Sequence, residues 1–398
     1  MKNKKGSFSL MKRMNTALIL GLIKDTNGVS RIDIAKTTGL TAATVTNLTS
    51  ELIDAGIVSE VATGESTGGR KPVILKINTE SFFAASAYIS SNTVEVALAD
   101  FNAEIKFYKK MTFDAESFSV DACVSFIHQS FEAFREKCRG KIIGLGLGLH
   151  GIVNPRDGVW LNAPNLNVKN SEIQRLIEDK CHIKVYAENN VRLMALAEMW
   201  FGTTKNIDDF VFLYVGKGVG GAIVTSRELM RGSSEAAGEI GHMTIDMSGP
   251  LCQCGKRGCL QAHTNESAML CRLRENLDKS DTLTANSTCD EMIDAFINHE
   301  DKAAATVVEE EIRYLSTGIS NIINIFNPKL IVLSSRIKNF DIAVLEKLSE
   351  IASGGGVAGD VSGCSVRYST LGERAVLKGC VARVLSEVYD NPAIIKEV

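Results

Sequence analysis

The chain has 398 residues, which is enough for two or three domains that each bury a core. Its 45% hydrophobic and 23% charged residues are typical of a globular protein and exclude a disordered or fibrous one. The net charge of −3 is unevenly spread: residues 1–80 carry 11 Lys/Arg against 7 Asp/Glu, and the remainder carries 33 against 40. This asymmetry predicts that a basic head meets a polyanion and that an acidic body does not.

The chain shows no targeting or membrane signal. It has no apolar run of 18 residues and no cleavable signal peptide, so we expect a cytoplasmic protein without a membrane partner. Ten cysteines in a reducing compartment do not predict a disulfide scaffold, and clustered cysteines there are expected to be metal ligands.

The basic head begins with three predicted helices. Residues 11–26 carry apolar residues at helical spacing, and residues 29–60 break into two helices about a turn. Ser30 is expected to cap the first of these two helices and Thr41 the second. Gly39 supplies the turn between them, because glycine tolerates a positive φ angle.

The second of these two helices predicts a DNA-reading face. Val45, Leu48 and Leu52 form one apolar stripe, and the opposite side is small, polar and uncharged. Such a face can approach base edges in the major groove, and the basic tip of the following hairpin is typical of a wing that contacts phosphates. A helical hairpin used for dimerisation or packing is the alternative. The predicted DNA contacts are Thr41, Ala43, Thr44, Thr46, Asn47, Ser50, Arg70 and Lys71.

From residue 81 onward, strands alternate with long helices, which predicts an α/β body. Residues 216–221 read G-K-G-V-G-G, a literal G-x-G-x-x-G motif. We reject a dinucleotide site there, because the motif must open a helix and here β-branched residues continue as a strand. The segment is expected to be a glycine hairpin that a phosphate or another backbone approaches, or a tight hairpin without a ligand.

Three cysteines predict a metal site. Cys252, Cys254 and Cys259 supply three soft donors, and a tetrahedral zinc site needs a fourth. By spacing alone His242 and His263 are equal candidates, and buried free thiols without a metal are the alternative. A metal held by four protein ligands is structural, because no coordination position is left open.

Several motifs together resemble the ROK family of sugar kinases and sugar-responsive repressors. They are GIVNPRDGVWLNAPNL (151–166), AENNVRLMALAEMWFG (187–202), VGKGVGGAIV (215–224), GEIGHM (238–243), CQCGKRGCLQAH (252–263) and NIINIFNPKLIVL (321–333). The resemblance covers nearly the whole chain, and its repressor branch carries a winged helix in front.

The resemblance implies an α/β fold with an actin-like, two-lobed sugar-kinase (ASKHA-type) body behind an N-terminal winged helix-turn-helix domain. The expected boundaries are 1–80 for the DNA-binding domain and 81–398 for the body. Within the body, the first lobe spans about 81–190 plus a C-terminal helix at 378–398. The second lobe spans about 191–377 and carries the zinc loop 242–259.

The resemblance also implies the site residues. It selects His242 as the fourth ligand of one structural zinc ion beside Cys252, Cys254 and Cys259. It places sugar-facing groups at Gly151, Asn165, Asn189, Asn190, Glu239, His242 and Gln261. Carboxylate and amide groups suit a sugar, because its hydroxyls both donate and accept hydrogen bonds.

The sequence departs from the family's kinases on the nucleotide side. Asn190 stands where a kinase has the Asp that takes the hydroxyl proton. The phosphate motif D-x-G-G-T appears as YISSNT (88–93), Lys217 replaces a Thr, Ser334–Ser335 replaces a glycine pair, and Gln261 replaces a Glu. These changes together predict a protein that binds sugar and is not an enzyme.

We therefore expect a transcriptional repressor with operator DNA and a sugar or sugar phosphate effector as partners. Paired heads on a pseudo-palindromic operator predict a homodimer or a higher homo-oligomer. A sugar held between the lobes is expected to change the spacing of the heads. An active sugar kinase with a fused head, or a regulator that senses another protein, are the alternatives.

Overall fold

The computed structural model describes residues 8–62, 73–354, 363–392 and 394–397. The chain forms two compact units: the first comprises residues 1–193 and 377–398, and the second residues 194–376. The sequence analysis divided the body into lobes after residues 190 and 377 and treated residues 1–80 as a separate domain, whereas the first unit includes those residues. None of the described helices combines the length and apolar character needed to cross a membrane.

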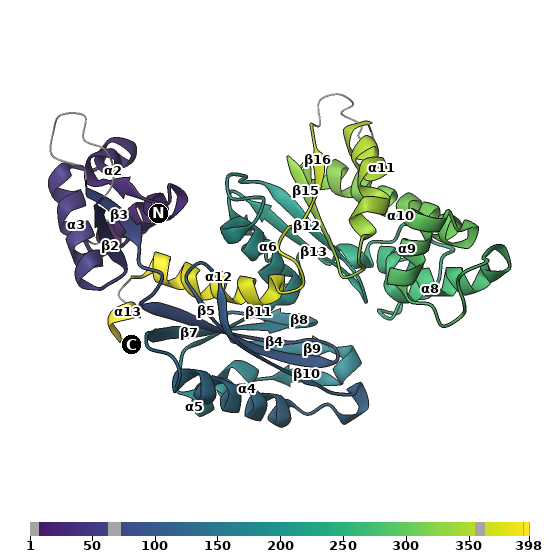
Figure 1. Cartoon of the computed structure of the whole chain (residues 1–398), viewed down its shortest axis with the longest axis horizontal. Coiled ribbons are helices and arrows are strands. Elements are labelled where there is room, and N and C mark those ends of the chain that lie inside the picture. Colours follow the sequence, from purple (N-terminus) through teal and green to yellow (C-terminus); the bar gives the residue numbers. More distant parts are fainter. Residues whose placement is uncertain (1–7, 63–72, 355–362, 393, 398) are drawn as a thin grey trace. The chain divides into compact units, whose positions relative to one another are not determined.

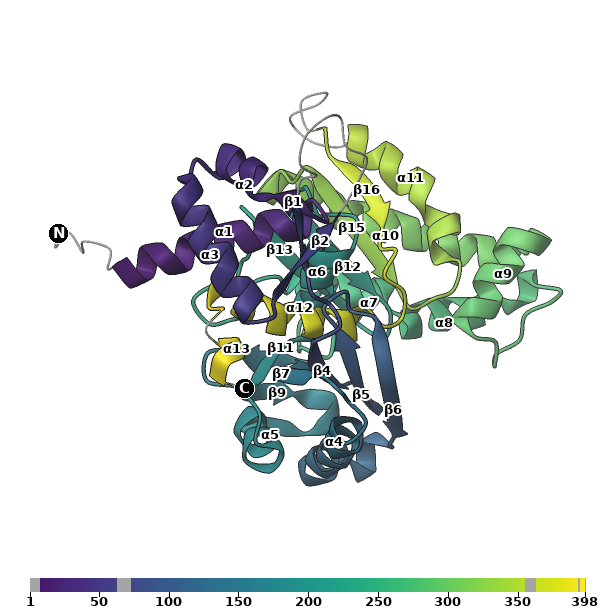
Figure 2. The same ribbon diagram turned by 60° about the vertical axis from the view of Figure 1, so that its left-hand side comes forward.

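The head at the start of the first unit is a winged helix-turn-helix (Figure 2). Its small sheet has the order β1-β3-β2, and all its pairs are antiparallel. The head has a core of its own that includes Ile19, Leu20, Ile34 and Val45. Its elements are α1 (Phe8–Asp25), β1 (Val29–Ser30), α2 (Arg31–Thr38), α3 (Ala42–Asp54), β2 (Val58–Ala62) and β3 (Val73–Ile77).

The predicted helix ends of the head are confirmed. The Ser30 side chain accepts a hydrogen bond from the Asp33 N–H at the start of α2, and Thr41 accepts one from the Thr44 N–H at the start of α3. Gly39 ends α2 with φ 71°, a left-handed conformation that glycine adopts without strain.

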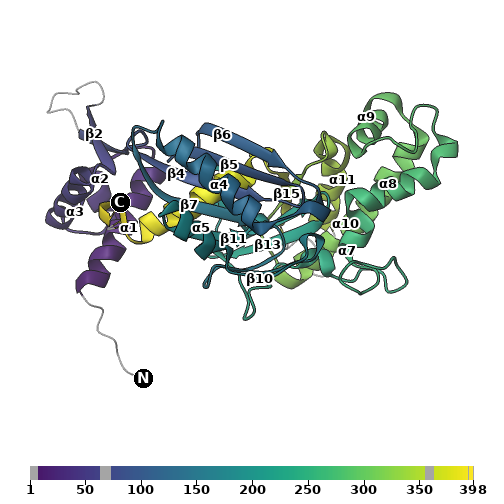
Figure 3. The same ribbon diagram turned by 90° about the horizontal axis from the view of Figure 1, so that it is seen from below.

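The rest of the first unit is built on a five-stranded sheet with the order β11-β7-β4-β5-β6. Helices α4 and α5 pack together on one face (Figure 3). Strands β11, β7 and β4 are parallel neighbours, so their carboxyl ends meet at one edge. The elements are β4 (Phe82–Ile89), β5 (Thr93–Asp100), β6 (Ile105–Thr112), α4 (Val120–Arg135), β7 (Lys141–Leu149), β8 (Ile152–Asn154), β9 (Val159–Ala163), β10 (Val168–Ser171), α5 (Ile173–Cys181), β11 (Val185–Asn189), α6 (Asn190–Phe201), α12 (Ala375–Asp390) and α13 (Ile394–Glu397).

Helix α12 covers the opposite face of this sheet at very close range. A Cβ atom on Gly146 of β7 would overlap the backbone of Cys380, and one on Gly144 would crowd Val384. A Cβ atom on Gly379 would likewise overlap the backbone of Leu193 in α6. Because α6 crosses the first unit boundary and α12 begins at the second, the two segments that connect the units are in backbone contact.

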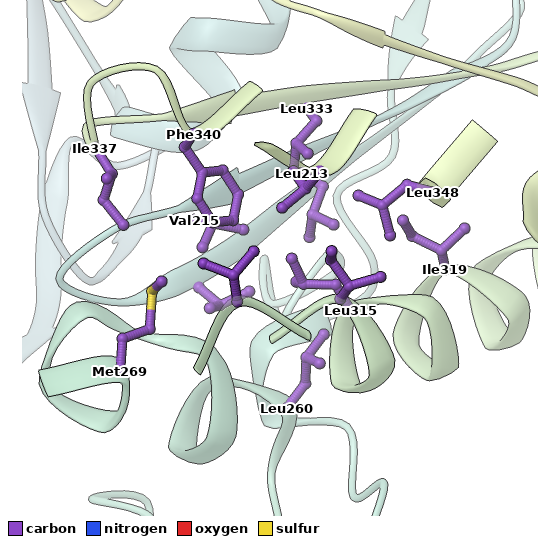
Figure 4. Packing of buried hydrophobic residues seen from close by; sticks show 14 of the residues in the cluster. Leu213, Val215, Leu260, Met269, Leu315, Ile319, Leu333, Ile337, Phe340 and Leu348 are labelled. Carbon is purple, nitrogen blue, oxygen red and sulfur yellow. The ribbon is translucent and has the colours of Figure 1, made fainter. Parts of the chain in front are cut away.

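The second unit has a five-stranded sheet with the order β14-β13-β12-β15-β16. Leu213, Val215 and Leu333 of this sheet pack against Leu315 and Ile319 of a long helix in one apolar core (Figure 4). The elements are β12 (Phe210–Val215), β13 (Val219–Thr225), β14 (Glu228–Leu229), the 3₁₀ turn η3 (Ile240–His242), α7 (Leu260–Thr264), α8 (Glu266–Glu275), α9 (Cys289–His299), α10 (Lys302–Phe326), β15 (Leu330–Ser335), α11 (Phe340–Gly354) and β16 (Ser365–Tyr368).

The glycine motif at 216–221 is a hairpin, as predicted. Strand β12 pairs antiparallel with β13 from Phe210↔Val224 to Val215↔Val219, so the chain continues as strand after the turn. No helix opens at this point, and the dinucleotide interpretation is excluded by the geometry.

Candidate functional site

Four side chains of the second unit form a cluster that fits a metal ion. His242, Cys252, Cys254 and Cys259 place one ligand atom each within 4.8 Å of the others. Tetrahedral zinc, with Zn–S about 2.3 Å and Zn–N about 2.0 Å, sets two sulfurs about 3.8 Å apart and a sulfur and a nitrogen about 3.5 Å apart. The Cys254 and Cys259 sulfurs are 3.6 Å apart, and His242 Nδ1 is 3.6 Å from the Cys252 sulfur. The donor set and its spacing therefore fit zinc.

The structure distinguishes the two histidines that spacing alone made equal candidates for the fourth metal ligand. His242 lies in the cluster. His263 instead stacks on the Tyr314 ring with the centroids 4.2 Å apart, and burial lowers its pKa. The family resemblance therefore selected the histidine that the fold brings to the cysteines.

The local backbone folds the cysteine loop into a knuckle. The Cys252 N–H donates to the Lys256 carbonyl at 2.7 Å, and the Gly255 N–H donates to the Cys252 carbonyl at 2.9 Å. Gly255 and Gly258 have φ angles of 88° and 68°, which favour glycine. The two glycines of C-x-C-G-x-x-G-C thus turn the chain so that all three sulfurs face one point.

Two predicted sugar-facing residues contact this cluster directly. The Glu239 carboxylate lies 3.9 Å from His242 Nε2, so the ring presents one nitrogen to the sulfurs and the other to Glu239. Gln261 donates to the Cys252 sulfur at 3.7 Å and accepts from the Val219 N–H at 3.3 Å. Gln261 therefore ties the metal cluster to the glycine hairpin, a link that the sequence analysis did not foresee.

Three of the predicted sugar-facing residues of the first unit, Gly151, Asn189 and Asn190, lie at or just after the carboxyl ends of the parallel strands β7 and β11. Asn189 ends β11 and donates from Nδ2 to the Gly151 carbonyl at 2.8 Å, which joins the ends of β11 and β7. Asn190 begins α6 and is 7% exposed. Asn165 is exposed in a 3₁₀ turn after β9. Ligands of open α/β sheets bind at such strand ends.

One residue at these strand ends was missed by the sequence analysis. The Asn190 Nδ2 donates to the Tyr88 hydroxyl at 3.5 Å, across 102 positions of the chain. Tyr88 is the first residue of YISSNT, the segment that stands in place of the kinase motif. The sequence signal was the tyrosine itself, an amphipathic side chain next to last in a buried strand, and only the register of β4 with β7 and β11 brings it to Asn190.

The head presents the predicted face. Val45, Leu48 and Leu52 are buried on one side of α3 as expected. Of the predicted contacts on the other side, Thr44 is half-buried, and Thr41, Ala43, Thr46, Asn47 and Ser50 are exposed. Strands β2 and β3 form the hairpin of the wing. Arg70 and Lys71 lie outside the described residues.

Comparison with known proteins agrees with this architecture. The model of the ROK family matches residues 89–384, and a winged helix-turn-helix DNA-binding model matches residues 16–59. A xylose repressor of Caldicellulosiruptor bescii is 31% identical over 97% of this chain and 99% of its own length. The transcriptional dual regulator NagC of Escherichia coli is 28% identical over 85% of this chain and 84% of its own length.

Solved structures show the same fold. The crystal structure of a ROK family transcriptional regulator, described as a homologue of the E. coli MLC protein, covers 97% of this chain and all of its own. Its TM-score is 0.85 at 24% identity. The ROK hexokinase of Thermus thermophilus covers 78% of this chain and all of its own, with a TM-score of 0.64 at 23% identity. The chain belongs to the ROK family, with a winged helix-turn-helix domain ahead of an actin-like body.

Proposed function

We propose that this protein is a transcriptional repressor that binds operator DNA through its head. Its affinity for the operator rises or falls when its body binds a sugar. One observation carries the proposal. A winged helix-turn-helix with an uncharged, exposed reading face on α3 shares a chain with a ROK body, and the body carries amide and hydroxyl groups at its strand ends. A homodimer, in which two heads meet two half-sites, follows from the symmetry of such operators.

The metal cluster supports the proposal as a structural staple. One zinc ion held by His242, Cys252, Cys254 and Cys259 would fix the position of Glu239 and Gln261, the two residues that contact the cluster. Neither side chain then needs a large core beside it to hold its orientation. A bound zinc would supply rigidity here and no reaction chemistry.

We infer that the protein does not transfer phosphate. The strand ends that would hold the base and organise magnesium carry a tyrosine hydroxyl and an amide, and neither accepts a proton at neutral pH. A sugar kinase with a fused head is the second candidate function, because ROK kinases are among the structural relatives. A regulator whose body senses another protein is the third.

The test has two parts. Operator sites are first selected from random DNA with the full-length protein. The affinity of the protein for these sites is then measured with and without xylose, glucose, N-acetylglucosamine and the 6-phosphates of the last two. At least one sugar should shift DNA affinity and raise the melting temperature of the protein by mass action. A protein that binds DNA but responds to no sugar would favour the protein-sensing candidate.

The kinase candidate is tested separately with a coupled ADP assay. The wild-type protein and Asn190→Asp should both show no sugar-dependent ATP turnover above background. A single positioned base is worth a factor of roughly 10²–10⁴ in rate, and phosphate and metal contacts are missing as well. Measurable turnover by the wild type would establish the kinase candidate instead.

A further inference from the structure

We propose that Tyr88 and Asn190 form a neutral, hydrogen-bonded pair that selects an uncharged sugar and rejects a phosphorylated one. The inference rests on the proposed function and names the chemical class of its effector. It starts from the edge of the first unit's sheet where β4, β7 and β11 end side by side, with Tyr88 and Glu188 both in register with Gly148. Gly148 lies between Tyr88 and Glu188 in the sheet and contributes no side chain there.

The ionisable side chains at this edge are either uncharged or paired with an opposite charge. Within residues 86–92, 146–154 and 186–192 the basic side chains are His150 and Arg192. Burial lowers the pKa of His150, so its ring is uncharged at pH 7. Arg192 is 4% exposed and forms an ion pair at 3.5 Å with Glu188, which is fully buried. A phosphate dianion placed here would meet a carboxylate and no uncommitted cation among these segments.

Two backbone turns at this edge are also occupied by the protein's own side chains. At the start of α6, Asn189 Oδ1 accepts the N–H groups of Val191 at 2.9 Å and Arg192 at 3.2 Å. Helix N-termini bind anions through such N–H groups, and here an uncharged amide takes them.

The turn between β4 and β5 is closed in the same way. The Ser90 hydroxyl accepts the N–H groups of Asn92 at 3.3 Å and Thr93 at 2.9 Å. These turn donors are therefore committed within the protein, and a phosphate would have to displace the Ser90 side chain to reach them. In both turns the protein's own side chains accept these backbone N–H groups, so neither turn offers them to an anion.

The Tyr88–Asn190 pair suits a neutral hydroxyl instead. A tyrosine hydroxyl donates and accepts, and an amide offers both kinds of atom, so each matches a sugar hydroxyl without any charge. Asn190 is 7% exposed and Tyr88 is half-buried, so a hydroxyl bound here would be largely withdrawn from water. Pairing the two side chains also fixes their orientation before a ligand arrives.

The first experiment uses the full-length wild-type protein. Isothermal titration compares glucose with glucose 6-phosphate, N-acetylglucosamine with its 6-phosphate, and xylose. We expect a neutral sugar to bind at least about tenfold more tightly than the matched phosphate, since an uncompensated charge costs more than the ~1.4 kcal/mol that corresponds to tenfold. A phosphate that binds as tightly as its parent sugar overturns the inference and leaves the proposed function intact. Failure of every sugar and phosphate to bind removes the proposed function itself.

The second experiment assigns the selection to these residues. Tyr88→Phe should weaken binding of the preferred neutral sugar by about 2- to 10-fold, the range of one hydrogen bond. Tyr108→Phe is the matched control, because Tyr108 is on the edge strand β6 of the same sheet and donates its hydroxyl to Glu95 at 2.8 Å. Equal sugar affinity in Tyr88→Phe and wild type would contradict the role of Tyr88.

A third variant is read out by the ratio of two ligand affinities, which a general loss of stability does not change. Ser90→Ala frees the N–H groups of Asn92 and Thr93. The ratio of the affinity for the neutral sugar to the affinity for its phosphate should therefore fall. An unchanged ratio in this variant would show that the occupied turn does not contribute to the rejection. If Tyr88→Phe fails to fold, the wild-type comparison and Ser90→Ala still decide the proposal.

Discussion

The two glycines of the cysteine loop allow a sharp test of how the metal cluster is built. Gly255 and Gly258 both have positive φ angles, 88° and 68°. They differ in their surroundings: an added Cβ atom on Gly255 meets nothing within 4 Å, whereas one on Gly258 would overlap the carbonyl of Asp246. Gly258→Ala therefore adds a backbone collision to the strain that both substitutions share.

The expected magnitudes follow from these surroundings. A left-handed conformation costs a non-glycine residue about 1–2 kcal/mol, so Gly255→Ala should destabilise the second unit by that amount. Overpacking adds about 1–3 kcal/mol, so Gly258→Ala should cost about 2–5 kcal/mol. Gly258 also precedes Cys259, a proposed metal ligand whose backbone pairs with Thr244, so relief of the collision would move this cysteine. We expect zinc affinity to fall in Gly258→Ala and to change little in Gly255→Ala.

Two measurements check this prediction. Thermal unfolding of the zinc-loaded protein reports stability, at ~2–4 °C per kcal/mol for a unit of this size. Release of zinc to a coloured chelator reports the metal site. Equal melting temperatures and equal release rates for the two variants would refute the reasoning, because the collision with Asp246 at position 258 has no counterpart at position 255.

Three further predictions concern metal, pH and DNA. Purified protein should carry about one zinc per chain by metal analysis, and Cys254→Ser should lose it while Cys271→Ser, an exposed cysteine outside the cluster, should not. Burial raises the pKa of Glu311 to about 8. Because this pKa lies above the unfolded value of about 4.3, even with Arg272 2.6 Å from the carboxylate, the free energy of unfolding should fall as pH rises from about 4.3 toward 8. Glu311→Gln should flatten the pH dependence of the melting temperature over that window, and an unchanged profile would contradict the assignment. Asn47→Ala should lower discrimination between operator and random DNA by about 1–3 kcal/mol in mobility-shift titrations, with little change for random DNA.

Local chemistry made much of the fold predictable. The caps at Ser30 and Thr41, the left-handed Gly39 and the buried stripe of α3 depend on neighbours within a few positions, and each was predicted. The hairpin at 216–221 was predictable for the same reason, because β-branched residues follow the glycines.

Contacts between distant segments could not be predicted in this way. The pairing of Tyr88 with Asn190 depends on the order of three strands, which no local pattern contains. The link from Gln261 to Val219 and Cys252 likewise requires the hairpin to lie beside the metal cluster. The choice of His242 over His263 came from family resemblance, since both spacings permit a tetrahedral site.

The contact between Gly379 and Leu193 has a mechanical consequence. The chain leaves the first unit after Leu193 and re-enters it at Leu377, and these two covalent links start from one point of backbone contact. Because backbone touches backbone there, with no side chain between that could adjust, α6 and α12 can shift at this point only together. A larger residue at 379 would separate the two helices close to where both covalent connections leave the first unit.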